Sequence, residues 1–395
     1  MQDVVIASAV RTAIGKFGGS LADVPATDLG TVVVAEALRR ADVAPEDVDE
    51  VIMGHVLQAG CGLNTARQVA LQTGLPVTCS AFTVNKVCAS GMKAAALGAQ
   101  SIACGERNVV VVGGMENMSR APYLLDKARS GYRLGDGELL DCLLRDALHD
   151  PTEDCHMGIT AENLAEEFGI SRQAQDEFAA QSQQKTAAAI NAGRFDTETV
   201  PVGVPQRKGD PLSFARDEFP RPDTTVDVLG KLKPAFKPDG SVTAGNASGI
   251  NDGAAAMVLL SAEEASRRKI QPMARIVSCA SGGVEPAKMG LGPVPATKAA
   301  LAKAGLSLDR IEIIELNEAF ASQSLAVIGE LGLHRDMVNL NGGAIALGHP
   351  VGASGARIVV TLLHLMADRG ATLGLATLCV GGGQGMAMIV ERPGT

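Results

Sequence analysis

The sequence predicts an α/β protein with five layers in the order α/β/α/β/α, built from two duplicated halves and a domain inserted into the first. The segments that begin at Leu38 and Leu301 both read as a helix end, a turn and an apolar strand that enters a loop. The segments that begin at Val87 and Val351 both read as a loop with Ala-Ser-Gly, an apolar helix, a buried strand and a glycine cluster. The same order in both halves indicates duplication, and strands that alternate with helices indicate layered sheets.

The helices expected from Ala89 and Ala353 are apolar on nearly every face. Such a helix is usually buried on all sides, so we expect both of them between two sheets, as the middle layer. From about residue 119 to residue 247 the composition changes, with several prolines and a charged helix that Ser171 caps. The predicted domains are residues 1–118 with 248–270 for the first half, 119–247 for the inserted loop domain, and 271–395 for the second half.

The overall composition excludes several classes of function. The 395 residues are 46% hydrophobic and 20% charged, with a net charge of −9. This acidic balance argues against nucleic-acid binding, and no apolar run has the length that a bilayer requires. The chain begins without the basic and apolar regions of a signal peptide, and it ends in ERPGT, which is not a peroxisomal signal. We therefore expect a cytoplasmic protein that contacts neither a membrane nor nucleic acid.

Eight cysteines are spread over the chain, none in a C-x-x-C pair and none at a spacing from histidine that suits zinc. No metal site is predicted. Because no secretory signal is present, a disulfide framework is not expected either. Most of these cysteines are expected to be small buried hydrophobic residues, and packing remains the alternative for each cysteine considered below.

Cys88 lies in NKVCASGMKA, between the strand expected at residues 81–84 and the first apolar helix. A helix N-terminus stabilises a thiolate and offers unpaired backbone N–H groups to an oxyanion. Gly91 permits a close approach to this helix. The pattern predicts a nucleophile whose surroundings lower its pKa from the ordinary value of about 8.5. A cysteine that only packs at the helix end stays an open alternative.

Further loops hold polar residues at the ends of predicted elements. His349 lies between a glycine and a proline ahead of the second apolar helix, and by the duplication its loop is the twin of the Cys88 loop. Cys379 ends a strand and precedes the glycines of CVGGGQG; the apolar residues that follow read as a strand, which disfavours a dinucleotide-binding loop. Asn317, in NEAF, follows an apolar strand, and the small polar residues of 243–253 suit a backbone close to a ligand. Each has an alternative as a surface, packing or turn residue, but together they predict one site.

The motifs NKVCASGMKA, NEAF, GHPVGASG and CVGGGQG occur here in the order in which the thiolase family has them, and the sequence resembles that family over essentially its whole length. The stretch HMGITAEN resembles the short-chain branch. The resemblance implies the thiolase fold, two β-α-β-α-β-α-β-β halves with a loop domain inserted into the first. It also implies reversible condensation of two acetyl-CoA molecules to acetoacetyl-CoA and free coenzyme A.

The resemblance further implies a role for each residue of the site. Cys88 would be the acylated nucleophile, His349 would accept its proton and later polarise a thioester carbonyl, and Cys379 would remove the α-proton of the second acetyl group. Asn317 would hold a water that forms one oxyanion hole with His349, and the backbone N–H groups of Cys88 and Gly381 would form the other. Coenzyme A thioesters are then the substrates, no cofactor is bound, and the kinetics are ping-pong.

The resemblance to the thiolase family also implies which residues contact the substrate. The positions expected to contact coenzyme A are His156, Arg221 and Ser248. The positions expected around the acyl group are Leu148, Met157, Phe236, Ala319 and Phe320. Val228 stands where many relatives have a serine, which removes one expected cofactor contact.

The segment 121–142 resembles the family's tetramerisation loop, so a homotetramer made of two dimers is predicted. Three other functions compete with the short-chain reading. A ketoacyl synthase typically has a second histidine or an asparagine where this chain has Cys379. A non-catalytic acyl-CoA carrier should have lost Cys88, His349 or Cys379, and all three are present. A thiolase for longer 3-ketoacyl-CoA esters has the same chemistry with a wider acyl pocket.

Overall fold

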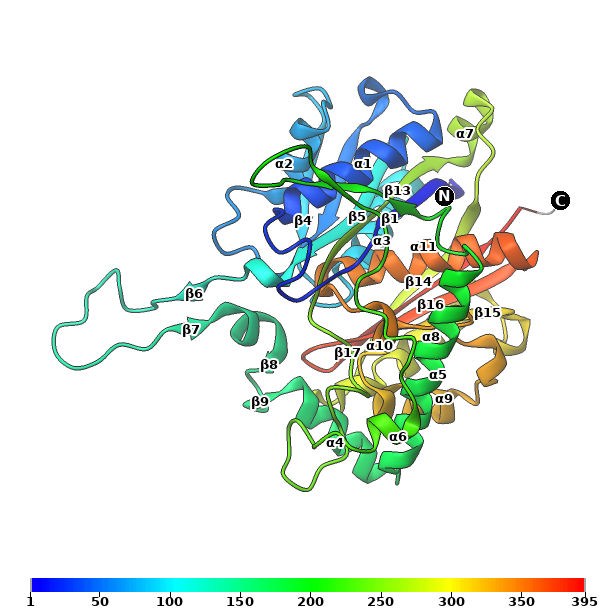
Figure 1. Cartoon of the computed structure of the whole chain (residues 1–395). Helices are drawn as coiled ribbons and strands as arrows, with labels where there is room; N and C mark the ends of the chain where they lie inside the picture. Colours follow the sequence, from blue (N-terminus) through cyan, green and yellow to red (C-terminus); the bar gives the residue numbers. More distant parts are fainter. Residues whose placement is uncertain (1, 394–395) are drawn as a thin grey trace.

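The two predicted halves form two stretches of one 11-stranded sheet in the computed structural model, which describes residues 2–393 (Figure 1). Met1, Gly394 and Thr395, at the two ends of the sequence, lie outside the described residues. The strands of the first stretch are β1 (Val4–Thr12), β3 (Glu50–Gly54), β4 (Ser80–Val84), β5 (Val109–Asn117) and β13 (Asn251–Ser261), with the short β2 (Gly15–Lys16) and β10 (Thr199–Val200) beside them. The strands of the second stretch are β14 (Ala274–Gly283), β15 (Ile313–Leu316), β16 (Leu373–Val380) and β17 (Gln384–Glu391).

The order of strands confirms the duplication. The first stretch runs β1-β13-β5-β3-β4 and the second runs β14-β17-β16-β15, so four strands correspond one to one. The innermost pairing is antiparallel in each stretch, and the outermost of these four strands is parallel to its neighbour, β3 to β5 and β15 to β16. Where the first stretch has β4, the second has a single bridge of Ile314 with Val338. The two stretches meet where two residues of β1, Val5 and Ile6, pair with β14.

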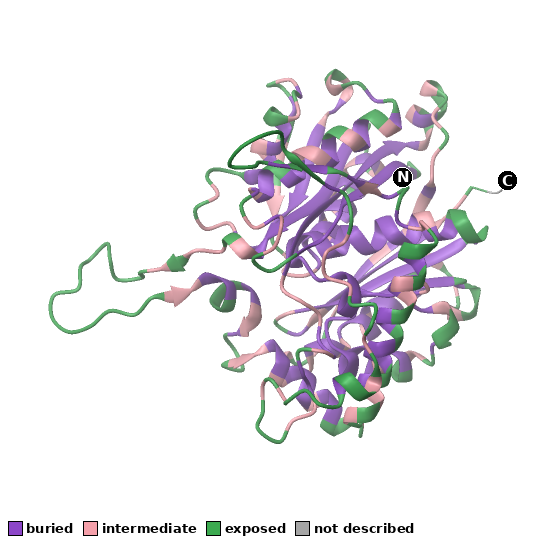
Figure 2. Cartoon of the chain, in the orientation of Figure 1, coloured by how far each residue is buried: buried purple, intermediate pink, exposed green. Residues whose placement is uncertain are grey.

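The helices cover and separate these two stretches. They are α1 (Ala26–Ala41), α2 (Thr65–Gln72), α3 (Ser90–Ala103), α4 (Met157–Glu167), α5 (Arg172–Asn191), α6 (Val226–Leu229), α7 (Ala262–Arg268), α8 (Pro293–Ala304), α9 (Ala321–Leu331), α10 (Ala344–Leu347) and α11 (Val351–Arg369). One core joins α1 and α2 to the outer face of the first stretch, and another joins α8 and α9 to the outer face of the second. A third core contains α3, α11 and the inner faces of both stretches, and its elements are buried almost throughout (Figure 2). The five predicted layers are therefore confirmed.

Among residues 2–393, one helix has the length and composition of a membrane span, and burial explains it. This helix is α11, and 83% of its apolar window is buried inside the protein. A core helix of an α/β protein has the same apolar composition as a spanning helix, because both must avoid water on all sides. The cytoplasmic location stays a prediction.

The inner helices α3 and α11 approach each other through small residues. A Cβ atom at Gly91 would lie 2.8 Å from the Cβ of Ala356, and one at Gly355 would lie 2.7 Å from the backbone nitrogen of Met92. The approach to the sheet is equally close, since a Cβ at Gly114 would lie 2.2 Å from the carbonyl oxygen of Gly352. These contacts bring the N-terminal ends of both helices to one place.

The segment inserted between β5 and β13 has its own small elements. They are the β6 (Tyr123–Leu124) and β7 (Leu140–Asp141) hairpin, the β8 (His149–Asp150) and β9 (Cys155–His156) hairpin, α4, α5, the β11 (Val202–Val204) and β12 (Leu212–Phe214) hairpin, and α6. Ser171 caps α5 as predicted, because its side chain accepts a hydrogen bond from the backbone of Ala174. The β11–β12 hairpin was not predicted, since its stretch reads as irregular. The loop between β6 and β7 projects from the body as a long arm (Figure 1).

The close contact of the inner helices predicts opposite changes in stability for two glycine-to-alanine substitutions. Gly355→Ala in α11 should destabilise the protein by about 1–3 kcal/mol, because the added methyl group meets backbone that cannot move away. Gly329→Ala in α9, where a Cβ meets nothing within 4 Å, should stabilise it by up to about 1 kcal/mol through helix propensity. The midpoints of urea unfolding measure both changes. Equal midpoints for the two variants would show that the helices separate without cost.

Candidate active site

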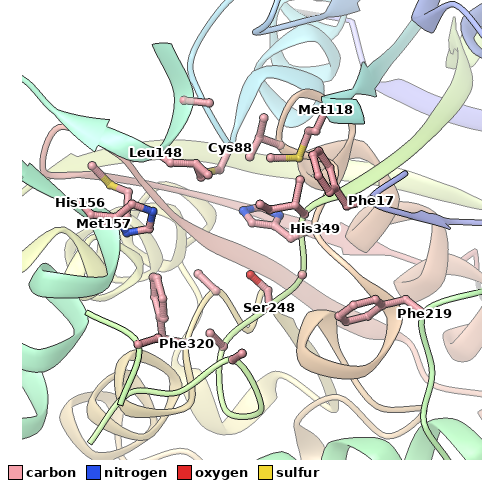
Figure 3. A pocket seen from close by; sticks show the side chains of 18 of the residues that line it. Phe17, Cys88, Met118, Leu148, His156, Met157, Phe219, Ser248, Phe320 and His349 are labelled. Carbon is pink, nitrogen blue, oxygen red and sulfur yellow. The ribbon is translucent and has the colours of Figure 1, made fainter. Parts of the chain in front are cut away.

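A cavity of about 620 Å³ lies where the N-terminal ends of α3 and α11 meet the inserted segment. Every site residue predicted from the sequence lines it except Asn317. The lining residues predicted in advance are Cys88, Leu148, His156, Met157, Arg221, Phe236, Ser248, Ala319, Phe320, His349, Cys379 and Gly381. In Figure 3 the centre of the cavity is occupied by Cys88, His349 and Ser248, one end by His156 and Met157, and the other end by Phe17 and Phe219.

The loop that carries Cys88 is fixed by its own side chains. Asn85 Oδ1 accepts a hydrogen bond from the backbone N–H of Val87 (3.0 Å). Ser90 Oγ accepts one from the N–H of Lys86 (2.8 Å) and donates to the carbonyl of Val87 (2.6 Å). Val87 has a φ of +46°, which is uncommon for a β-branched residue and typical of strained functional loops. The loop therefore holds the cysteine in one position at the start of α3.

The electrostatics of Cys88 differ from the expectation. Loss of water around the sulfur raises the pKa of the thiol to about 11, although hydrogen bonds from the backbone N–H groups of Gly381 and Cys88 itself lower it. The prediction of a lowered pKa is therefore wrong for the free protein, because desolvation outweighs the N–H groups of the helix end. The same two N–H groups are the donors predicted for an oxyanion hole, and they converge on the sulfur.

His349 is held by two side chains that were not predicted. Asn251 Oδ1 accepts a hydrogen bond from the backbone N–H of His349 (2.9 Å), and Nδ1 of the imidazole lies 2.6 Å from Ser354 Oγ. The single hydroxyl proton of Ser354 is donated to the carbonyl of Pro350 (2.9 Å), so Nδ1 carries the ring proton and donates to Ser354. Burial, and then the charge of Arg357, lower the pKa of His349 to about 3. The ring is therefore neutral, with the lone pair on Nε2 free to accept a proton.

Cys379 is the second thiol of the cavity. It is the last residue but one of β16 and is almost completely buried. Burial raises the pKa of this thiol, and the neighbouring Cys88 raises it further. The turn that follows needs glycine at Gly382 and Gly383, where φ is +80° and +79°. This turn places the N–H of Gly381 beside Cys88.

Asn317 follows β15 directly, as predicted, but does not line the cavity. Its side chain is completely buried, and neither Oδ1 nor Nδ2 has a hydrogen-bond partner in the described residues. A buried amide without partners costs free energy unless a water or ligand completes its bonds. Glu318 next to it is fully bonded, because it accepts hydrogen bonds from Ser182 and Asn339. The unpaired amide of Asn317 is therefore suited to hold a water.

An aromatic row forms one side of the cavity. The His156 ring stacks on Phe236 with 4.6 Å between centroids, and Phe236 meets Phe320 edge to face at 6.2 Å. His156 Nδ1 accepts the N–H of Gly158 (3.0 Å), which leaves the proton of the neutral ring on Nε2. Phe236, Phe320, Ala319 and Met157 belong to one apolar cluster with Cys379 and with Met289, which was not predicted. This cluster closes the cavity next to the second thiol.

Two of the residues expected to contact coenzyme A, Arg221 and Ser248, line the cavity from different loops. Arg221 is exposed, and its guanidinium lies over the ring of Phe219, 5.6 Å from the centroid. The backbone N–H of Ser248 donates to the carbonyl of Ala319 (2.9 Å), which joins the 243–253 loop to the NEAF loop. Val228 is exposed on α6 and does not line the cavity.

Several lining residues escaped sequence reasoning. Lys16 is the last residue of β2, Phe17 follows it, and Met118 comes from the turn after β5. The glycines around Phe17, in GKFGG, were the available signal, since a large aromatic residue in a glycine loop often lies at a functional surface. Met118 and Met289 gave no signal, because isolated methionines in apolar stretches read as core. Ser354 lies within the motif GHPVGASG, but the sequence does not indicate its contact with the His349 ring.

The arrangement combines a thiol and a neutral imidazole with a second thiol and backbone N–H donors, which suits acyl transfer and proton transfer. Among the described residues no three His, Cys, Asp or Glu side chains are grouped as metal ligands. All eight cysteines, which lie within the described part of the chain, are free thiols.

Comparisons with known proteins show the family of the chain. Residues 4–263 match the family model for the thiolase N-terminal domain, and residues 270–392 match that for the thiolase C-terminal domain. The chain is 61% identical over 393 residues to the acetyl-CoA acetyltransferase of Escherichia coli K12, and 59% identical over 392 residues to that of Pseudomonas aeruginosa; both matches cover 99% of this chain and 100% of the relative.

Solved structures give the same result. The acetyl-CoA acetyltransferase of Bacillus anthracis has a TM-score of 0.98 at 47% identity, with 100% of this chain and 99% of that chain covered. Human mitochondrial 3-ketoacyl-CoA thiolase in complex with CoA has a TM-score of 0.96 at 45% identity, with 100% and 98% covered. The motifs, the duplicated fold and the full-length relatives all agree, and the chain belongs to the thiolase family.

Proposed function

We propose that this protein is an acetyl-CoA C-acetyltransferase, which condenses two acetyl-CoA molecules to acetoacetyl-CoA and coenzyme A and catalyses thiolysis in reverse. The observation that carries the proposal is the meeting of Cys88, neutral His349 and Cys379 in one cavity beside backbone N–H donors. Full-length relatives named acetyl-CoA acetyltransferase support it. Coenzyme A thioesters are its substrates, and the protein needs no bound cofactor.

In the first half-reaction Cys88 attacks the thioester carbonyl of acetyl-CoA. Its proton passes to Nε2 of His349, and the oxyanion that forms is stabilised by the N–H groups of Cys88 and Gly381. The carbon–sulfur bond to coenzyme A then breaks, and the leaving thiolate takes the proton of Cys379. This leaves acetyl-Cys88, a protonated His349 and a thiolate at Cys379.

In the second half-reaction the Cys379 thiolate removes an α-proton from a second acetyl-CoA. Because burial raises the pKa of this thiol, its thiolate is a strong base. The enolate oxygen is stabilised by protonated His349 and by a water on Asn317, whose amide is otherwise unpaired. The enolate carbon attacks acetyl-Cys88, acetoacetyl-CoA leaves, and the Cys88 sulfur regains its proton from His349. All three groups return to their starting states.

Substrate binding is assigned to the inserted segment. His156, Arg221 and Ser248 would lie along coenzyme A, with the Nε2 proton of His156 available to a pantetheine oxygen, and Leu148 would lie beside the acyl group. The acyl group would lie against Met157, Phe236, Ala319 and Phe320, whose cluster closes the cavity at Cys379. This closure favours a short acyl chain.

A thiolase for longer 3-ketoacyl-CoA esters is the second candidate. The likeness to human mitochondrial 3-ketoacyl-CoA thiolase favours it. The apolar wall of Met157 and Met289 argues against it, although one methylene in such a pocket changes binding by only about 1–3 kcal/mol. The two candidates share their mechanism and differ only in acyl-chain length.

Turnover of acetoacetyl-CoA with free coenzyme A tests the proposal directly. We expect rapid loss of the 3-ketoacyl enolate absorbance with acetoacetyl-CoA, and little loss with a long-chain 3-ketoacyl-CoA. Cys88→Ala should abolish turnover and the acetyl adduct. Cys379→Ala should still form acetyl-Cys88 slowly but lose condensation by roughly 10²–10⁴. Equal turnover of both chain lengths would select the second candidate, and no turnover by the folded protein would reject thiolase chemistry.

The pKa of Cys88 predicts the pH dependence of its reactivity in the free enzyme. Because that pKa is raised to about 11, the thiolate fraction grows as pH rises and is small at neutral pH. Alkylation of Cys88 by iodoacetamide, followed by peptide mass spectrometry, should therefore keep increasing up to about pH 11. A plateau reached below the ordinary thiol pKa of about 8.5 would show instead that the helix end activates the thiol.

The projecting β6–β7 arm supports the proposal of a homotetramer made of two dimers. Leu134 at its tip is 99% exposed, and Leu139 is 64% exposed; large apolar side chains in water mark an interface. Light scattering should give the mass of a tetramer for the natural protein. The mass should be smaller for the variant in which Leu134 and Leu139 are both replaced by serine. Leu212→Ser, at another exposed leucine, should leave the mass unchanged. A dimer of the natural protein would overturn the proposal.

A further inference from the structure

A buried carboxylate that the mechanism does not use lies next to the first turn of α11. Glu116, at the end of β5, is completely buried and does not line the cavity. Its Oε2 accepts hydrogen bonds from the backbone N–H groups of Val56 (3.1 Å) and Gly352 (2.8 Å), and its Oε1 accepts one from the N–H of Leu57 (3.1 Å). Gly352 is in the first turn of α11, three residues after His349. Glu116 therefore joins the loop after β3 to the start of the His349 helix.

His55 extends this contact to the strand that leads to Cys88. Its Nε2 lies 3.3 Å from Glu116 Oε1, and its Nδ1 lies 3.1 Å from Thr65 Oγ1, which in turn contacts Thr83 of β4. The backbone N–H of His55 donates to the carbonyl of Val84 (3.0 Å), the last residue of β4. One chain of contacts thus runs from the base of the Cys88 loop through His55 and Glu116 to α11.

Glu116 and His55 pack closely against the first turn of α11. A Cβ at Gly352 would lie 2.6 Å from Glu116 Oε2 and 3.1 Å from the Cα of His55. A carboxylate at a helix N-terminus is also favoured by the helix dipole. Hydrogen bonds, charge and close packing therefore act together on the first turn of α11.

We propose that Glu116, together with His55, is a positioning residue for acyl transfer, which holds His349 at a fixed distance from Cys88. The inference rests on the proposed function, because acylation of Cys88 is the step it serves. Neither side chain lines the cavity or meets the reacting atoms. Proton transfer from the thiol to the imidazole depends on their geometry, and a displacement of about 1 Å costs roughly 10² in rate.

The charge of Glu116 affects the pKa of Cys88, and this effect can be measured. A residue that only packed would leave that pKa unchanged. After desolvation, Glu116 is the charged group that raises the pKa of Cys88, while His349 and Cys379, the titratable neighbours in the cavity, are neutral at neutral pH. Loss of that charge should lower the pKa of Cys88. The alkylation profile of Cys88 should then move to lower pH even as acylation becomes slower.

The test compares Glu116→Gln with the natural enzyme in two measurements. Quenched-flow mass spectrometry with acetyl-CoA should show acetyl-Cys88 forming about 10–100-fold more slowly in the variant, with KM for acetyl-CoA nearly unchanged. Iodoacetamide alkylation of Cys88 across pH should show the profile displaced to lower pH. A folded variant with the natural acylation rate and an undisplaced profile would overturn the proposal.

Two further variants separate positioning from general damage. Glu162→Gln removes another buried carboxylate, which accepts hydrogen bonds from the backbone N–H groups of Ser241 and Val242. This variant should leave the pH profile of Cys88 alkylation unchanged. If the profile moved here too, the effect of Glu116→Gln would not be specific, and the proposal would be rejected. If Glu116→Gln does not fold, Thr65→Val replaces it in the test, because it removes the partner of His55 Nδ1. This variant should also form acetyl-Cys88 more slowly than the natural enzyme, and an unchanged acylation rate would reject the proposal. If the natural enzyme forms no acetyl-Cys88, the proposed function fails, and the alkylation profile still decides whether Glu116 acts on Cys88.

Discussion

The close approach of α3 and α11 is the constraint on which the site depends. An ordinary side chain at Gly91 or Gly355 would push the two helices apart, and their N-terminal ends would no longer reach one cavity. Because each helix belongs to one half of the duplication, the contact also fixes the two stretches of sheet relative to each other. It brings the Cys88 loop of the first half against the His349 loop of the second. The glycines therefore serve the chemistry through packing, without touching the substrate.

Burial rather than a charge pair sets the protonation states in the cavity. Desolvation raises the pKa of both thiols and lowers the pKa of His349, so all three groups are neutral before the substrate binds. In the free enzyme, a Cys88 thiolate facing an imidazolium would be a charge pair in a poorly solvated place, which is costly to maintain. With neutral groups, charge develops only as the acyl group is attacked, at the point where N–H donors are already in place. Ser354 completes the arrangement, because it keeps the ring proton on Nδ1 and the accepting lone pair toward the cavity.

The sequence predicted the features that repeat or that stand out chemically. The order of elements, the layers and the convergence of Cys88, His349 and Cys379 followed from duplicated motifs, because equivalent loops of twin halves must face each other. The raised pKa of Cys88 could not be predicted from the sequence. A position at a helix N-terminus suggests a lowered pKa, whereas the depth of burial that raises it depends on the tertiary structure. The stretch 243–253 was expected near a ligand, but the hydrogen bond between Asn251 and His349 was missed because the two residues are far apart in the chain. Phe17 was missed for the same reason. The β11–β12 hairpin was missed because its residues lack a strong alternating pattern.

The irregular backbone around the cavity is held at three points by the same device, a buried carboxylate that accepts hydrogen bonds from the main chain or from side-chain amides and hydroxyls. Glu116 binds the start of α11, Glu162 binds the loop at Ser241, and Glu318 binds α10 through the N–H of Ile345. Each carboxylate satisfies N–H groups that loops cannot satisfy by themselves. Glu116 and Glu318 belong to the duplicated scaffold, whereas Glu162 belongs to the inserted segment, which also carries most of the residues that shape the cavity. Substitutions in the inserted segment can therefore change the substrate preference, while the scaffold keeps the two thiols and the imidazole in their relative positions.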